Sequence, residues 1–170
     1  MLEILKFPDD RLKQISKPVE RFDSKLHKLL DDMAVTMYGA KGVGLAAPQV
    51  AELVRLFVID IGEEASQECG IPRRLYEFIN PKISQKSGKI VFEEGCLSVP
   101  GVTEEVTRSE HIVVNFQDRQ GKDQEMEATG LLAVAIQHEN DHLDGILFIE
   151  KLSPLKRRLV KRQLSKAVTL

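Results

Sequence analysis

Two histidines and a glutamate within one short segment carry the clearest chemical signal of the sequence. His138 and His142 are four residues apart, so on a helix both imidazoles leave the same face, about one turn apart, and can bind one metal ion. Glu139 projects beside them, where it can act on a water molecule without binding the ion. The spacing therefore predicts a metal-binding helix with Glu139 as the base of a hydrolytic reaction.

The residues that precede this segment indicate that the site lies inside the protein. The run 131–136 is apolar nearly all round, and a charged cluster next to such a run needs a functional reason. The alternative, two surface histidines that happen to fall at helical spacing, fits this setting poorly. Asp141 could orient a ligating imidazole, but we interpret it as a carboxylate on the helix surface and leave it out of the site.

An open catalytic metal site needs a third protein ligand besides the two histidines. Downstream, only the carboxylates of Asp144 and Glu150 are available, whereas upstream Cys96 follows a predicted strand and offers a thiolate. A lone cysteine is ordinarily a buried core residue, but beside an incomplete metal site we expect Cys96 to be the third ligand. A thiolate suits Fe(II), Zn(II) or Co(II), and the sequence does not choose among them.

A glycine-rich segment, residues 42–49, has two competing interpretations. It matches the Gly-x-Gly-x-x-Ala dinucleotide-binding pattern, but that pattern requires a strand before it and a helix after it, and here a helix precedes it and Pro48 follows. A better interpretation is a loop whose small residues let a substrate backbone come near, with the Gln49 amide as a hydrogen-bond donor. A tight structural turn with no ligand remains the alternative for this segment alone.

The rest of the chain predicts the elements that hold these residues. Apolar spacing and turn residues predict helices over 24–38, 131–142 and 154–164, and strands over 53–61, 75–83, 89–92, 111–117 and 123–127. Turns rather than helices join neighbouring strands, which is typical of a largely antiparallel sheet. We therefore expect one α+β domain, residues 1–170, with a mostly antiparallel sheet packed around a central metal-binding helix and a C-terminal helix. The polar stretch 63–74 is interpreted as a loop.

Composition and the N-terminal sequence limit the partners and the compartment that we expect for this protein. The formal net charge of -2 gives no general attraction to nucleic acid or anionic membranes, so we expect neither a membrane nor a specific DNA partner. Two cysteines are too few for a disulfide framework and fit a reducing compartment. The N-terminus has no signal-like pattern, and no apolar run approaches the roughly 20 residues that span a bilayer, so we expect a cytoplasmic protein.

The C-terminal helix is strongly basic. Its cationic residues are Lys156, Arg157, Arg158, Lys161, Arg162 and Lys166. The simplest interpretation is a solvated helix face, and the alternative is a weak attraction to a large RNA-containing partner such as the ribosome.

Three of these segments, taken together and in order, resemble the peptide deformylase family of the bacterial type. Residues 42–49 match the family's Gly-φ-Gly-φ-Ala-Ala-x-Gln pattern, residues 94–98 its Glu-Gly-Cys-φ-Ser pattern and residues 137–142 its Gln-His-Glu-x-Asp-His pattern, where φ is apolar. Residues 7–12 and 152–156 also resemble the family's ends, so the resemblance covers most of the chain. Asn140 departs from it, since many members have an apolar residue there, and the stretch 101–107 matches poorly.

The resemblance implies an amide hydrolase that removes the N-formyl group from the N-terminal methionine of newly made polypeptides, a co-translational step that releases formate. It implies one divalent metal ion, natively Fe(II) in many members, with Zn(II), Ni(II) or Co(II) as alternatives. The implied metal ligands are Cys96, His138 and His142. The implied catalytic groups are Glu139, the Gln49 side-chain amide and the Leu97 backbone N–H, of which the last two stabilise the oxyanion.

The resemblance also implies a site for the peptide. Gly44 would hydrogen-bond the peptide backbone of an N-formyl-methionyl substrate. The implied methionine side-chain pocket is lined by Val43, Phe92, Leu131, Val134 and Ala135.

Two other functions compete with this one. An endopeptidase could use the same helix, but it would need a long open cleft and is usually secreted, and a cysteine ligand argues against it. A metal-stabilised binding module would need a closed site with four protein ligands. No good fourth ligand is apparent, because His27 and His111 are better interpreted as surface or packing residues.

Overall fold

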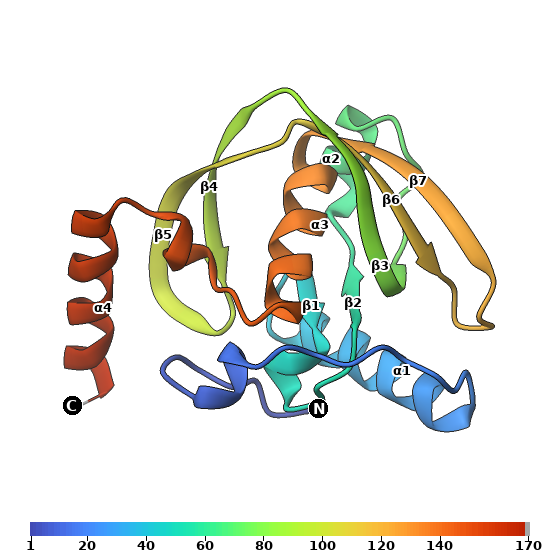
Figure 1. The fold of residues 1–170 in the computed structure, drawn as a ribbon, viewed down its shortest axis with the longest axis horizontal. Helices are drawn as coiled ribbons and strands as arrows, with labels where there is room; N and C mark the ends of the chain where they lie inside the picture. Colours follow the sequence, from blue (N-terminus) through green and yellow to red (C-terminus); the bar gives the residue numbers. More distant parts are fainter. Residues whose placement is uncertain (169–170) are drawn as a thin grey trace.

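The computed structural model describes residues 1–168 and shows an α+β fold with two antiparallel sheets (Figure 1). The larger sheet has the strand order β1-β2-β3-β6-β7: Gly44–Ala46, Leu56–Ile59, Tyr76–Ser87, His111–Gln117 and Asp123–Thr129. The smaller sheet pairs β4 with β5: Ile90–Cys96 and Val99–Arg108. The helices are α1 to α4: Ser24–Gly39, Gly62–Glu68, Gly130–Leu143 and Pro154–Val168.

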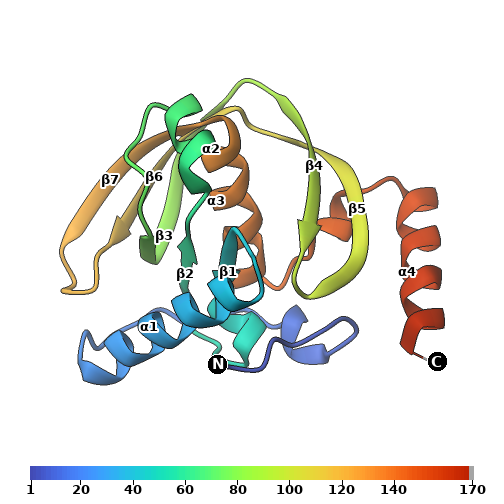
Figure 2. The ribbon, with the colours of Figure 1, turned by 180° about the vertical axis from the view of Figure 1, so that it is seen from behind.

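Helix α3 lies between the two sheets, as Figures 1 and 2 show from opposite sides. Its apolar residues Leu132 and Ile136 are fully buried in one core cluster with Phe57 of β2 and Phe78 of β3. A second cluster joins β5 to the segment after α3 and to α4. The predicted central helix is thus confirmed, and its burial follows from the apolar run that opens it.

The ends of α3 are set by two glycines with left-handed backbone angles. Gly130, with φ of +57°, turns the chain from β7 into the helix, and Gly145, with φ of +73°, follows its end. A side chain on Gly145 would overlap the backbone of Lys13, so the close approach also excludes larger residues there.

The hairpin of β6 and β7 has the predicted bounds at its turn. The Asp118 carboxylate accepts hydrogen bonds from the backbone N–H groups of Gln120 and Lys122, at 2.9 and 3.0 Å. Side-chain closure of this kind is typical of aspartate in turns, and it fixes the register in which β7 leads into α3.

Several expected elements differ from the observed ones. Residues 63–74 were expected to be a loop, but residues 63–68 belong to α2, with Glu63 and Glu64 in its first turn, where acidic groups stabilise a helix. The strand expected over 75–83 is β3, which continues past Pro81 to Ser87. The strand expected over 53–61 is shorter in the structure, where only Leu56–Ile59 form β2. Strands β1 and β5 were not expected at all. The helix expected over 24–38 is α1, which extends to Gly39, and its N-cap is Asp23, whose carboxylate accepts a hydrogen bond from the Leu26 N–H.

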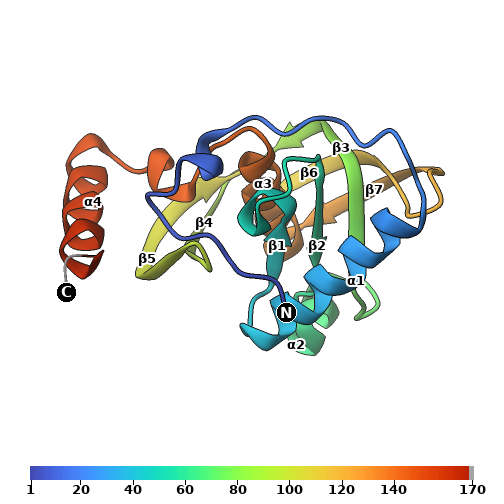
Figure 3. The same cartoon turned by 90° about the horizontal axis from the view of Figure 1, so that it is seen from below.

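The remaining segments surround this frame. Short 3-10 helices occur at Asp10–Lys13, Ala47–Val50 and Phe148–Lys151. Figure 3 shows α4 beyond β5, at the edge of the molecule away from the larger sheet. Within residues 1–168, no helix combines the length and apolar character needed to cross a membrane.

Candidate metal centre

The structure brings the three predicted metal ligands together. Cys96 ends β4, and His138 and His142 lie one turn apart on α3. One ligand atom from each of the three lies within 4.8 Å of those from the other two, and the Cys96 Sγ is 3.4 Å from the His142 Nε2. Both histidines are buried.

The donor set fits a single divalent ion. The His138 Nδ1 is engaged elsewhere, which leaves its Nε2 as the available ligand atom. Burial, together with the nearby His138 and Arg108, holds the pKa of His142 well below its usual value, so this imidazole is neutral, as a metal ligand must be. Burial acts to lower the pKa of His138, but hydrogen bonds with Cys96 and Glu94 raise it well above its usual value, so a metal ion has to displace one proton from this imidazole. The resulting thiolate and two neutral imidazoles would suit Fe(II), Zn(II) or Co(II).

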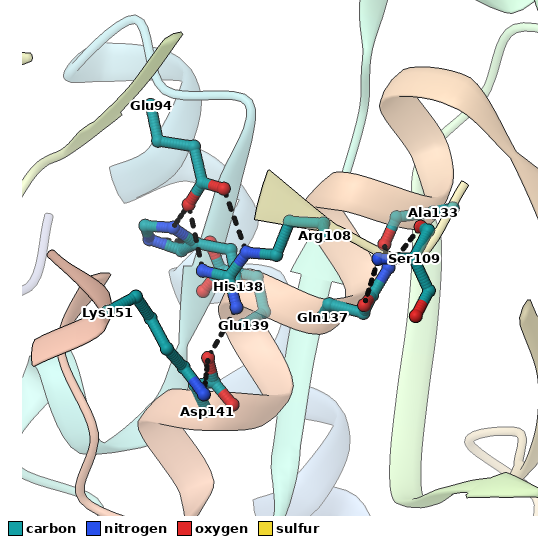
Figure 4. Close-up of polar contacts among 9 residues, drawn as sticks. All are labelled: Glu94, Arg108, Ser109, Ala133, Gln137, His138, Glu139, Asp141 and Lys151. Carbon is teal, nitrogen blue, oxygen red and sulfur yellow. Dashed lines mark hydrogen bonds and ion pairs between the residues drawn. The ribbon is translucent and has the colours of Figure 1, made fainter. Parts of the chain in front are cut away.

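A buried carboxylate that the sequence analysis did not assign orients the first histidine. The His138 Nδ1 donates to the Glu94 Oε1 at 2.8 Å, since a carboxylate can only accept (Figure 4). Glu94 in turn accepts two hydrogen bonds from Arg108, at 2.8 and 2.9 Å. Such an outer partner fixes the tautomer and the ring orientation of a metal-binding histidine.

Arg108 also binds Asp141, which the sequence analysis had placed on the helix surface. The Arg108 Nη1 donates to the Asp141 carboxylate at 2.6 Å, and the Lys151 ammonium lies 3.7 Å from the same carboxylate (Figure 4). Asp141 therefore helps to hold Arg108 in position, and through Arg108 it helps to hold Glu94. Burial acts to raise the pKa of Glu94, but hydrogen bonds from Arg108 and His138 lower it to about 2, so Glu94 stays ionised at neutral pH.

One sequence signal could have indicated Glu94. It precedes Cys96 by two residues on a strand, and residues two apart on a strand point to the same face. No comparable signal marks Arg108, because its contact with Glu94 depends on how β4 and β5 pair.

Gln49 and Leu97, the two residues expected to stabilise an oxyanion, both lie next to Cys96. The Gln49 side chain is fully buried, its Oε1 accepts from the Ala46 N–H at 2.9 Å, and its Nε2 lies 3.5 Å from the Cys96 Sγ and 3.0 Å from the Ser98 Oγ. Leu97 follows Cys96, and its carbonyl accepts from the Lys6 ammonium at 2.7 Å.

Glu139 is buried against the glycine-rich segment. A Cβ on Gly44 would lie 2.6 Å from the Glu139 Oε1, so only glycine fits beside this carboxylate. The Glu139 Oε2 is buried and has no hydrogen-bond partner among residues 1–168, and burial raises the pKa of Glu139 to about 7. A buried carboxylate oxygen without a hydrogen-bond partner is costly to stability and is typical of a group with a chemical task.

A cavity of about 470 Å³ connects these groups. Its lining includes Gln49, Cys96, His138 and Glu139, together with the six residues expected to contact a peptide: Val43, Gly44, Phe92, Leu131, Val134 and Ala135. The cavity is large enough for one amino-acid side chain and the adjoining backbone.

Comparison with known proteins decides the family. The family model described as polypeptide deformylase matches residues 1–158. The chain belongs to the polypeptide deformylase family. It is 53% identical over 166 residues to the peptide deformylase of Chromobacterium violaceum, which covers 98% of this chain and 95% of that protein.

Solved structures from the polypeptide deformylase family share the whole fold. A peptide deformylase from Legionella pneumophila has a TM-score of 0.89 and 47% identity, covering 99% of this chain and 96% of that one. The enzyme from Ehrlichia chaffeensis has a TM-score of 0.92 and 38% identity, covering 99% and 97%.

The buried carboxylate network yields a prediction about metal affinity. Replacing Glu94 with glutamine keeps an acceptor for His138 but removes the charge that balances Arg108. We expect Glu94→Gln to lower the affinity for Zn(II) about tenfold to a hundredfold, measured by competition with a chelator. Glu93→Gln, one residue earlier and exposed, is the matched control and should bind Zn(II) normally. Equal affinity in the two variants would contradict the role of Glu94.

Proposed function

We propose that this chain removes the N-formyl group from the N-terminal methionine of newly made polypeptides through its Cys96, His138 and His142 centre. Members of the polypeptide deformylase family are metal-dependent hydrolases of this kind. The observation that supports the assignment to these residues is the buried Glu139 carboxylate, whose Oε2 has no hydrogen-bond partner among the described residues and which lines the same cavity as Cys96 and His138. The products are formate and a free amino terminus.

Glu139 moves the protons of the reaction. A divalent ion held by the three ligands supplies Lewis-acid activation of water at neutral pH. Glu139 takes the proton of the attacking water and later delivers it to the departing amine. Burial favours its protonated form, whereas a nearby cation favours its ionised form, so the carboxyl can take and release a proton near neutrality.

Two donors stabilise the negative charge that develops on the formyl oxygen. The first is the Gln49 Nε2, which the Ala46 N–H holds in place by fixing the other end of the amide. The second is the Leu97 backbone N–H, next to Cys96. Because both are positioned before the substrate arrives, each loss costs on the order of 3 kcal/mol of transition-state stabilisation.

The cavity walls select the substrate. Val43, Phe92, Leu131, Val134 and Ala135 form an apolar pocket for the methionine side chain, and Gly44 lines the same cavity, where its backbone can hydrogen-bond the peptide. The Glu139 carboxylate, packed against Gly44, closes this side of the cavity and favours a formyl group over a larger acyl group. In this proposal residues 1–170 act as one catalytic domain, in the cytoplasm, where polypeptides are made.

The proposal extends to the partner that presents the substrate. On the outer side of α4, Arg158 and Arg162 are exposed and form no ion pair within the described residues, and Leu155 and Leu159 are also exposed there. Cations beside exposed leucines favour contact with the RNA and protein of a ribosome over simple solvation.

The role of Glu139 is tested by its closest isostere. Glu139→Gln should retain one metal ion per chain but release formate from formyl-Met-Ala-Ser at least about a hundredfold more slowly, because the amide cannot accept the proton. Formate release and metal content are measured on the same sample. Near-normal turnover in Glu139→Gln would rule out Glu139 as the base, and cleavage of internal peptide bonds by the parent protein would favour an endopeptidase.

We propose Fe(II) as the native ion, with Zn(II), Ni(II) and Co(II) as ions that the same ligands accept. Protein prepared without oxygen should contain iron at about one ion per chain and should lose formate release on exposure to air as the iron is oxidised. Protein reloaded with Ni(II) or Co(II) should resist the same exposure. Zinc as the main metal of the oxygen-free preparation would contradict the Fe(II) assignment.

Contact with the ribosome is tested by reversing charge on α4. Arg158→Glu with Arg162→Glu should abolish co-sedimentation with ribosomes at low salt while leaving the rate on formyl-Met-Ala-Ser unchanged, since α4 lies outside the catalytic cavity. Lys25→Glu with Lys82→Glu, two exposed lysines on other elements, is the control for net charge. Equal co-sedimentation of both double variants would contradict a specific role of α4.

A further inference from the structure

A second hollow lies on the side of Arg108 away from the catalytic cavity. Its volume is about 320 Å³, and none of its lining residues lines the catalytic cavity. It is formed where the β3–β4 turn and the end of β5 meet α3. The polar residues that matter here are Lys86, Lys89, Arg108, Asn140, Asp141 and Lys151.

The charges around this hollow do not cancel. Four cationic side chains line it, and Asp141 is its single lining carboxylate among the described residues. Asp141 is shared between Arg108 and Lys151, and Glu94 binds the other edge of Arg108. Lys86 and Lys89 form no ion pair within residues 1–168. The hollow therefore has a positive potential that a bound anion would neutralise.

The floor of the hollow is rigid and still has donors to offer. The Arg108 side chain is only 5% exposed, and its contacts with Glu94 and Asp141 use three of its five N–H groups. A fixed guanidinium at the bottom of a concave site, with flexible lysines at the rim, is a common arrangement for binding phosphate groups.

Asn140 contributes a polar side chain to the lining of the hollow, and the fold of the described residues gives this side chain no other role. Its Oδ1 is buried and has no hydrogen-bond partner among the described residues. A half-turn of the amide exchanges its oxygen and nitrogen without changing its shape, so the side chain can present a donor to an anion.

We propose that this hollow is a binding site for a small phosphate-bearing anion, held by Lys86, Lys89 and Lys151 at the rim and by Arg108 and Asn140 at the floor. Its volume suits a small molecule. A nucleic-acid strand would need a groove that continues past the site, and the lining residues form a single hollow.

Amide resonances of the ¹⁵N-labelled, Zn(II)-loaded enzyme test the proposal, because they report where an anion binds. Inorganic phosphate, added at constant ionic strength against chloride, should cause saturable shifts at the backbone of Lys86, Lys89 and Ser109 and at the Asn140 side chain. Lys86→Ala with Lys89→Ala should weaken the affinity at these resonances about tenfold or more, since two charged contacts are lost.

Two further variants separate a specific site from general charge. Lys82→Ala removes an exposed lysine from the same strand but outside the hollow, and should change the affinity less than about twofold. Asn140→Leu should weaken it severalfold. The proposal is overturned if phosphate causes no saturable shift at these residues, if Lys82→Ala has as large an effect as the double variant, or if a six-nucleotide RNA saturates the resonances and phosphate does not.

Discussion

A buried ion pair between Arg108 and Glu94 joins the two strands of the smaller sheet, and the same two side chains bind the helix that carries the two histidines. Their side chains are 5% and 4% exposed, and the pair continues through Glu94 to His138 and through Arg108 to Asp141. Removing one member of such a pair leaves an uncompensated buried charge, which typically costs about 3–5 kcal/mol. The same contacts hold α3 against β4 and β5 and set the angle of a metal ligand, so stability and chemistry depend on one set of hydrogen bonds.

Burial explains how the proposed catalytic groups acquire their properties. Low exposure keeps His142 neutral, as metal binding requires, and leaves the Glu139 Oε2 without a partner among the described residues. The unpaired carboxylate oxygen is unfavourable in an apolar interior, and a cation bound nearby would reduce that cost. The glycine-rich segment completes the enclosure, since Gly44 lies against Glu139 and Gln49 reaches the Cys96 sulfur. The burial of Leu132 and Ile136 in the core holds the helix in place despite the cost of this carboxylate.

Local patterns in the sequence predicted the elements that carry their own signal. The apolar run before His138 predicted α3, and alternation with a polar turn predicted the β6 strand at its observed bounds. Strand β5 was missed because Thr103, Glu104 and Glu105 interrupt its apolar alternation. Helix α2 was missed because it is short and polar and buries only Ser66.

Local patterns also predicted part of the candidate site. Cys96, His138 and His142 followed from residue type and spacing, and the structure brings them together. The role of Asp141 was not predictable, because it depends on Arg108, which lies 33 residues before it. The spacing of Glu94 from Cys96 offered a local signal, but the ion pair of Glu94 with Arg108, 14 residues later, had none. A contact of that kind is created by strand pairing and helix docking, which no local pattern encodes.

The central claim is that one cysteine and two histidines of this chain hold the catalytic ion. X-ray absorption at the zinc edge of the Zn(II)-loaded enzyme tests it directly, because sulfur and nitrogen scatter at different distances. The account predicts one sulfur at about 2.3 Å and two imidazole nitrogens at about 2.0–2.1 Å, with the sulfur contribution lost in Cys96→Ser. A spectrum with no sulfur, or one that Cys96→Ser leaves unchanged, would contradict it.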